Sequence, residues 1–217
     1  MRRTVALIAG VVAGFSFGSA AILIRFLPHV DSNSIAFTRL FIGFWILLLI
    51  LHFRKRIKQL YELIKEYRLR PIVMGVLLGL HFIFFTASVK HTTVLHATIF
   101  VNTVPIQALV LSILIYRLKP SRRELLAVVL GFTGILIIAL TEFATLSGNI
   151  IGDLEALLAA TFIAIYLNIG ANLRKKVDAE VLMVSNFMLG YITIFIYSLP
   201  IQGGIHVPLE LLRFSYF

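Results

Sequence analysis

Seven long apolar stretches follow one another along the chain. They cover residues 5–27, 34–53, 71–89, 94–116, 125–141, 152–173 and 181–200. A helix of about 20 apolar residues is long enough to cross the ~30 Å hydrocarbon core of a bilayer. Unbroken apolar runs such as 44–51 and 134–140 lack the alternation of a membrane β-barrel strand. The pattern therefore predicts an all-α polytopic membrane protein with seven transmembrane helices.

The composition favours a bilayer over water. Hydrophobic side chains make up 59% of the 217 residues and charged ones only 14%, whereas soluble proteins are about 45–50% apolar. Soluble enzymes are thereby excluded. The chain has no cysteine, which excludes disulfide scaffolds, Fe–S clusters and cysteine nucleophiles. We expect neither a cofactor nor a metal.

The basic residues gather in every second connection. Of the 20 Lys and Arg residues, 16 lie at the N-terminus and in the loops 54–70, 117–123 and 174–176. Positively charged loops stay in the cytoplasm. The pattern predicts a multi-pass cell-membrane protein with a cytoplasmic N-terminus. The net charge of +10 is then a mark of orientation, and we expect no nucleic acid partner.

The number of spans predicts an inverted repeat. Five spans precede the Gly148-Asn149 break, so the sixth crosses the membrane in the direction opposite to the first. Inverted halves are typical of secondary transporters. The expected division is a five-helix repeat over 1–147 and an incomplete second repeat over 148–217.

Five short sequence patterns lie within the predicted spans or where a span begins. They are Ala13-Gly14-Phe15-Ser16-Phe17-Gly18-Ser19, Phe37-Thr38-Arg39-Leu40, Asn102-Thr103-Val104-Pro105, Gly131-Phe132-Thr133-Gly134 and Gly152-Asp153-Leu154-Glu155-Ala156-Leu157. In this order and spacing the sequence resembles the EamA-type branch of the drug/metabolite transporter superfamily. The resemblance implies ten helices in two inverted EamA-like repeats, both termini in the cytoplasm, and a permease that exports small metabolites.

The chain departs from that family at two places. The family carries a Gly-Glu-Arg-like turn after its fourth helix, where this chain has Tyr116-Arg117-Leu118. The second half holds only two predicted helices, and the resemblance implies three more beyond Phe217.

Arg39 is the first candidate substrate-binding residue. It lies about five residues, or roughly 8 Å, inside its predicted helix. A charge at that depth costs free energy unless it meets a partner or water, or extends to the interface. Two readings stay open, a snorkelling arginine and a substrate or gating contact. The family pattern favours the second.

The span 94–116 is the most polar of the seven. At 100° per residue, His96, Thr103 and Gln107 share one stripe, and Asn102 lies on the neighbouring one. Pro105 cannot donate a backbone hydrogen bond, so it predicts a kink near the middle of the membrane. Asn102, Thr103, Pro105 and Gln107 are therefore candidates for lining a substrate cavity, with a mechanical kink as the alternative.

His81, near the middle of span 71–89, completes the candidate site. A membrane histidine commonly bonds a neighbouring helix, and it can also carry a proton. The expected cargo is a neutral or anionic metabolite rather than an organic cation. Arg39 supplies positive charge, and no Asp or Glu is expected to be buried in the first five spans.

Small residues predict close helix packing. Gly10, Gly14 and Gly18 form two overlapping GxxxG patterns, and Gly75 and Gly79 form another. We expect these grooves to pack against helices of the same chain. A homodimer face is the alternative for the first three.

Catalytic motifs are absent from the sequence. There is no His-Glu-x-x-His pair and no Asp-rich Mg²⁺ motif, and the GxSxG sequence at residues 14–18 lies inside an apolar span instead of at a strand-to-helix elbow. The chain is therefore expected not to be an enzyme, and to contact the lipid bilayer and a small-molecule metabolite. A truncated, non-transporting membrane partner or scaffold, and an intramembrane enzyme, stay open as alternatives.

Overall fold

The computed structural model describes residues 3–142 and 148–206, and in these ranges its regular structure is entirely helical. The helices are α1 (Arg3–Arg25), α2 (Ser32–Phe53), α3 (Ile57–Tyr67), α4 (Leu69–His91), α5 (Val94–Val101), α6 (Val104–Tyr116), α7 (Arg122–Glu142), α8 (Ile150–Leu173) and α9 (Ala179–Gln202). Six described segments are long and apolar enough to cross a membrane: α1, α2, α4, α5 with α6, α8 and α9. The predicted all-α membrane class is confirmed.

The one predicted span without a counterpart among these six, 125–141, falls within α7. Several of its side chains lie outside the described residues, as do residues 143–147 at the expected join of the two repeats. The seven-span count, the inverted repeat and the division at residue 148 therefore stay predictions.

Short polar side chains begin several helices. Asp31 accepts the N–H of Ser34 at 2.8 Å where α2 begins. Asn149 accepts the N–H of Ile151 at 2.9 Å where α8 begins. An N-cap of this kind satisfies a backbone donor that has no partner inside the helix. The sequence thus marks these helix starts locally.

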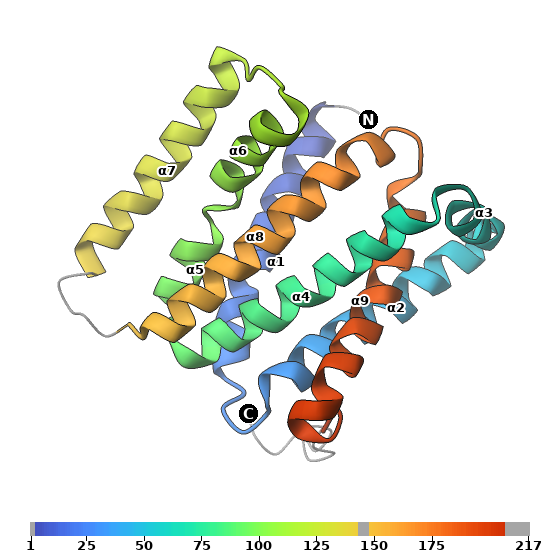
Figure 1. Ribbon diagram of the computed structural model, residues 1–217, viewed down its shortest axis with the longest axis horizontal. Helices are drawn as coiled ribbons and strands as arrows, with labels where there is room; N and C mark the ends of the chain where they lie inside the picture. Colours follow the sequence, from blue (N-terminus) through green and yellow to red (C-terminus); the bar gives the residue numbers. More distant parts are fainter. Residues whose placement is uncertain (1–2, 143–147, 207–217) are drawn as a thin grey trace.

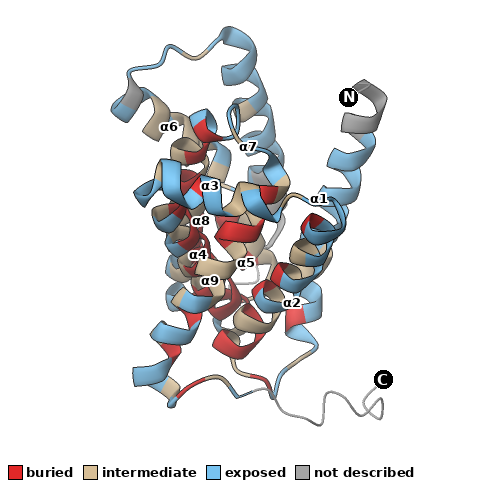
Figure 2. Ribbon diagram, turned by 90° about the vertical axis from the view of Figure 1, so that its right-hand side faces the viewer, coloured by how far each residue is buried: buried red, intermediate tan, exposed pale blue. Residues whose placement is uncertain are grey.

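The core surrounds α4. This helix packs against α8 on one side and α9 on the other, α2 packs on α9, and α5 and α6 pack on the far side of α8 (Figure 1). Met74, Leu173 and Ile194, from α4, α8 and α9, are fully buried in this core. By contrast α1 and α7 lie at the edge, and Figure 2 shows their surfaces mostly exposed.

The basic clusters share one end of the bundle. Figure 1 shows the beginning of α1, α3, the α6–α7 turn and the α8–α9 turn at this basic end. The α1–α2 and α4–α5 turns, the beginning of α8 and the end of α9 form the opposite end, here called the outer end. The segregation of charge along the sequence is thus also a segregation in space.

Two segments differ from the sequence prediction. Residues 57–67, expected within a basic loop, form the helix α3. The expected single helix 94–116 is interrupted at Asn102 and Thr103, where α5 ends at Val101 and α6 begins at Val104. Pro105 lies in the first turn of α6, where its missing N–H needs no intrahelical partner.

Candidate functional site

Arg39 lies within the transmembrane part of α2, seven residues or roughly 10 Å from its beginning. Its guanidinium carbon lies 4.8 Å from the ring centroid of Phe82 on α4, a cation–π contact. Its Nη1 atom is buried and has no hydrogen-bond partner among the described residues. A charged donor in the membrane is therefore left without a partner among the described residues.

His81 is buried next to Phe82 and links α4 to α8. Its Nδ1 lies 2.9 Å from the carbonyl oxygen of Ala159. Because a carbonyl oxygen only accepts, Nδ1 carries the hydrogen in this contact. The imidazole also stacks on Phe85 with ring centroids 5.9 Å apart. A hydrogen bond to a neighbouring helix is the common arrangement of a histidine within a membrane.

Thr103 and Gln107 face α8 from the break between α5 and α6. The Nε2 of Gln107 donates to the Thr103 hydroxyl at 3.0 Å. The Thr161 hydroxyl of α8 donates to Gln107 Oε1 at 2.8 Å. Two turns after Thr161 on α8, Asn168 donates to the carbonyl of Ala108, the residue that follows Gln107 on α6, at 3.0 Å. These contacts fasten the broken helix to α8.

Asn102 and Pro105 point elsewhere. Both are exposed, and with Ile106 they line a groove of about 400 Å³ whose other wall is α7. The wall on α7 is formed by Ala127, Val128, Gly131 and Phe132. The polar sector expected to line one cavity is therefore divided between an α8-facing pair and an α7-facing pair.

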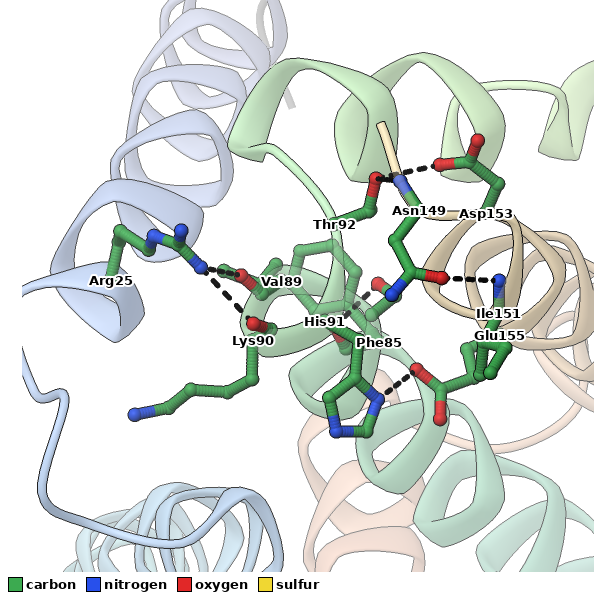
Figure 3. A network of polar contacts seen from close by, with 11 residues as sticks. Arg25, Phe85, Val89, Lys90, His91, Thr92, Asn149, Ile151, Asp153 and Glu155 are labelled. Carbon is green, nitrogen blue, oxygen red and sulfur yellow. Dashed lines mark hydrogen bonds and ion pairs between the residues drawn. The ribbon is translucent and has the colours of Figure 1, made fainter. Parts of the chain in front are cut away.

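A second polar cluster closes the outer end between α4, α5 and α8. The Thr92 hydroxyl donates to the Asp153 carboxylate at 2.9 Å and accepts the N–H of Asn149 at 3.0 Å (Figure 3). His96 Nδ1 lies 3.2 Å from the same carboxylate. His96 and Thr92 are buried. The beginning of α8 is thus bonded to the turn between α4 and α5.

A neighbouring set of contacts also joins helices at the outer end. Glu155, one turn after the capped start of α8, pairs with His91 Nδ1 at 2.8 Å (Figure 3). Arg25 donates to the carbonyls of Val89 and Lys90 at 3.1 Å, which joins α1 to the end of α4. Lys90 in turn donates to the carbonyl of Leu27. The outer ends of α1, α4 and α8 are held together by charge-assisted bonds.

A cavity of about 240 Å³ lies beside the pair of His91 and Glu155. His91 and Glu155 form part of its wall, and further side chains of α4, the beginning of α2 and the end of α9 form the rest. Asn33, almost fully buried, lines it, and Gln202 adds an Oε1 atom without a hydrogen-bond partner in the described ranges. The cavity therefore offers polar atoms at the outer end. No three His, Asp or Glu side chains among the described residues gather as a metal site would require.

The structure brings only some of the predicted residues together. Arg39 and His81 both contact Phe82, whereas Thr103 and Gln107 lie on α6 and its preceding turn, where Gln107 contacts α8. The pairing of Asp153 with Thr92 is not predicted by the sequence patterns. The one available indication was Asp153 near the beginning of a membrane helix, because acidic residues are costly in a span.

These features define a polytopic helical membrane protein with polar contacts between its helices. The model of the EamA-like transporter family matches residues 4–140, more than half of the chain. The chain therefore belongs to the EamA-like transporter family, and the resemblance to the drug/metabolite transporter superfamily is confirmed. No curated protein and no solved structure gives a significant match to the chain.

Proposed function

We propose that this protein acts as a secondary transporter of small metabolites, with Arg39 as a direct substrate contact. The observation that carries the proposal is the buried Nη1 of Arg39, which has no hydrogen-bond partner in the described part of the chain. An intramembrane charge is costly unless something compensates it. The Phe82 ring offsets part of that cost, and a bound substrate oxygen would satisfy the remaining donor.

The charge of the site favours a neutral or anionic cargo. No described Asp or Glu forms an ion pair with Arg39. Asp153 and Glu155 reach the first five spans from α8, but His96 and His91 already pair with them. An organic cation would therefore meet a guanidinium instead of a free carboxylate. A carboxylate or amide ligand would accept a charge-assisted bond from Arg39.

The proposed transport cycle opens and closes the two ends of the bundle alternately. In this proposal residues 1–147 and 148–217 belong to inverted repeats, the basic end faces the cytoplasm, and export is the direction. The contacts of Thr92 with Asp153 and of His91 with Glu155 would keep the outer end closed. Breaking them would let α8 move away from α4.

Thermal-shift screening of the purified protein tests the Arg39 contact. Amino acids, carboxylates and quaternary amines are screened with the natural chain, Arg39→Gln and the matched control Arg122→Gln, whose side chain is exposed at the beginning of α7. We expect carboxylates or amino acids to raise the melting temperature of the natural chain and of Arg122→Gln, but not of Arg39→Gln. Stabilisation by quaternary amines alone, unchanged in Arg39→Gln, would refute the contact.

Counterflow tests transport itself. The stabilising compound is loaded into proteoliposomes, and uptake of its labelled form is followed. We expect exchange that Arg39→Gln abolishes and Arg122→Gln keeps. Binding without exchange would instead favour a non-transporting partner, and chemical change of the compound would favour an intramembrane enzyme.

A further inference from the structure

The helix α3 lies across the bundle at its basic end. It follows α2 after a three-residue turn and leads directly into α4. Figure 1 shows α3 end-on while α2 and α4 run in the plane of the picture, and Figure 2 shows it from the side. Its axis is therefore nearly perpendicular to the transmembrane helices, so that it runs parallel to the surface of a bilayer that they cross.

One face of α3 is occupied by the protein. Leu63 is 3% exposed, and Leu60 and Tyr67 pack against the same core cluster. On a helix with 100° per residue these three side chains share a sector of about 60°. This face anchors α3 to the bundle and fixes which of its other faces point outward.

The adjoining face is apolar and exposed. Ile57 is 43%, Tyr61 68% and Ile64 39% exposed. These three side chains share the next sector of about 60°, as their spacing of four and three residues requires. In water, a second exposed apolar face on a helix that is already packed by its first one would be unfavourable. The second face therefore indicates another apolar medium beside the protein.

Basic side chains border this apolar face. Lys58 and Lys65 are exposed and occupy the sector beside Tyr61. Further exposed cations, Lys55, Arg68 and Arg70, lie at the two ends of the helix. By contrast Arg54 pairs with Glu180, and Arg56 with Asp178, at the beginning of α9. Five cations of this segment are thus not paired with α9.

The acidic residues of α3 lie beyond the basic ones, and Glu62 pairs with Lys58 at 3.7 Å on the exposed surface. Glu62 and Glu66 line a cavity of about 240 Å³ shared with Lys176 and Asp178 at the α8–α9 turn. Around the helix the order is core, apolar, basic and then acidic. This order matches the change from hydrocarbon through phosphate to water across one membrane interface.

We propose that α3 lies in the headgroup layer of the membrane and binds anionic phospholipids. Ile57, Tyr61 and Ile64 enter the boundary of the acyl chains, and Lys58 and Lys65 extend along that surface to lipid phosphates. Clusters of Lys and Arg directly beside a transmembrane helix bind anionic lipid in this way. The charge complementarity favours lipid over a protein partner, because the acidic side of α3 points away from the apolar face.

Single-cysteine labelling tests the depth of each face. The chain has no cysteine, so Tyr61→Cys and the matched Glu66→Cys each carry one environment-sensitive fluorophore. The labelled proteins are reconstituted in phosphatidylcholine, with or without phosphatidylglycerol. We expect a blue-shifted emission and quenching by spin-labelled lipid at Tyr61 only, both stronger with phosphatidylglycerol. Equal exposure to water at the two positions in both lipids would overturn the proposal.

Charge removal tests the headgroup part separately. The double variant Lys58→Gln/Lys65→Gln is compared with Lys119→Gln/Lys175→Gln, which removes the same charge from two other exposed sites. Each lysine near an anionic surface contributes about fivefold in affinity. The half-saturating phosphatidylglycerol concentration, followed with the Tyr61 label, should rise about thirtyfold in the first variant, and stay near its original value in the second. Equal changes in both variants would refute specific binding by α3. Because no transported compound enters either assay, the result is independent of the proposed transport function.

Discussion

The GxxxG patterns of α4 and α1 are alike in sequence but have different surroundings. A Cβ atom added at Gly79 of α4 would lie 2.7 Å from a backbone oxygen of α9, and one added at Gly75 would collide with a leucine side chain of α9. No described atom lies within 4 Å of a Cβ added at Gly10 or Gly14 of α1, and the same holds for Gly18. The packing expected of the α1 glycines is not made within the described chain.

The difference follows from the position of each helix in the bundle. Neighbours surround α4 on several sides, whereas the described part of α1 packs mainly against α4 and α5, and less closely. A glycine row permits two backbones to approach closely, but a partner must be present for the approach to occur. The pattern therefore describes a capacity of the helix surface, and the fold decides whether it is used.

A bulky side chain at each glycine tests this contrast most strongly. In Gly79→Leu the new side chain meets the backbone of α9, so the free energy of unfolding should fall by about 3 kcal/mol. In Gly14→Leu nothing described is displaced, and the change should stay within about 0.5 kcal/mol. Unfolding of the purified protein by SDS titration measures both. A loss in Gly14→Leu as large as that in Gly79→Leu would show that α1 has a tightly packed partner.

A smaller loss is expected from the outer end of α4. Thr92→Ala removes the donor to Asp153 and the acceptor of the Asn149 N–H, at a cost of about 2 kcal/mol. The control Ser112→Ala removes a bond only to the carbonyl of Leu109 in its own helix, at about 0.5 kcal/mol. The same SDS titration compares them, and Thr92→Ser should restore most of the stability. Equal losses would mean that the outer cluster contributes nothing beyond a local bond.

A third comparison contrasts α8 with α7. Thr161→Val leaves Gln107 Oε1 without its donor, so the free energy of unfolding should fall by about 1 kcal/mol. Thr133→Val in α7 removes a bond to the carbonyl of Val129 in the same helix, and should have almost no effect. Thermal melts of the two variants in one detergent measure the difference. Indistinguishable melting temperatures would argue against the α6–α8 contact.

Cysteine substitutions at two exposed positions should have the smallest effect on stability. Their labelling tests which end of the bundle faces the outside of the cell. Lys58→Cys lies at the basic end and Ile150→Cys at the outer end, and both side chains are highly exposed. Ile150 is preferred to Asn149 because Asn149 caps α8. A membrane-impermeant maleimide added to intact cells should label only Ile150→Cys. Labelling of Lys58→Cys under the same conditions would reverse the proposed orientation.

Much of the helical fold could be read from the sequence because hydrophobic runs in a membrane have few alternatives. A span of 20 apolar residues satisfies its backbone only as a helix, and caps such as Asp31 and Asn149 mark where two helices begin. The helix α3 could also have been predicted. Leu60, Leu63, Ile64 and Tyr67 have the spacing of an amphipathic helix, but the basic residues around them indicated a loop.

The candidate site was less predictable because it depends on which helices become neighbours. The predicted stripe of Thr103 and Gln107 was sound as a helical pattern, and both side chains do face α8. Asn102, on the adjacent stripe, faces the α7 groove instead. The break between α5 and α6 separates the two parts of a sector that an unbroken helix would have kept together.

The sequence alone determined the class of the protein, the position of its apolar spans and the segregation of its basic residues, because these depend on local hydrophobicity and charge. Only the tertiary structure decided that Asp153 meets Thr92 and His96, that Gly79 meets α9, and that Arg39 retains a donor without a described partner. Those relations join residues far apart in the chain. Local patterns do not encode them, because they depend on which helix faces come together when the bundle packs.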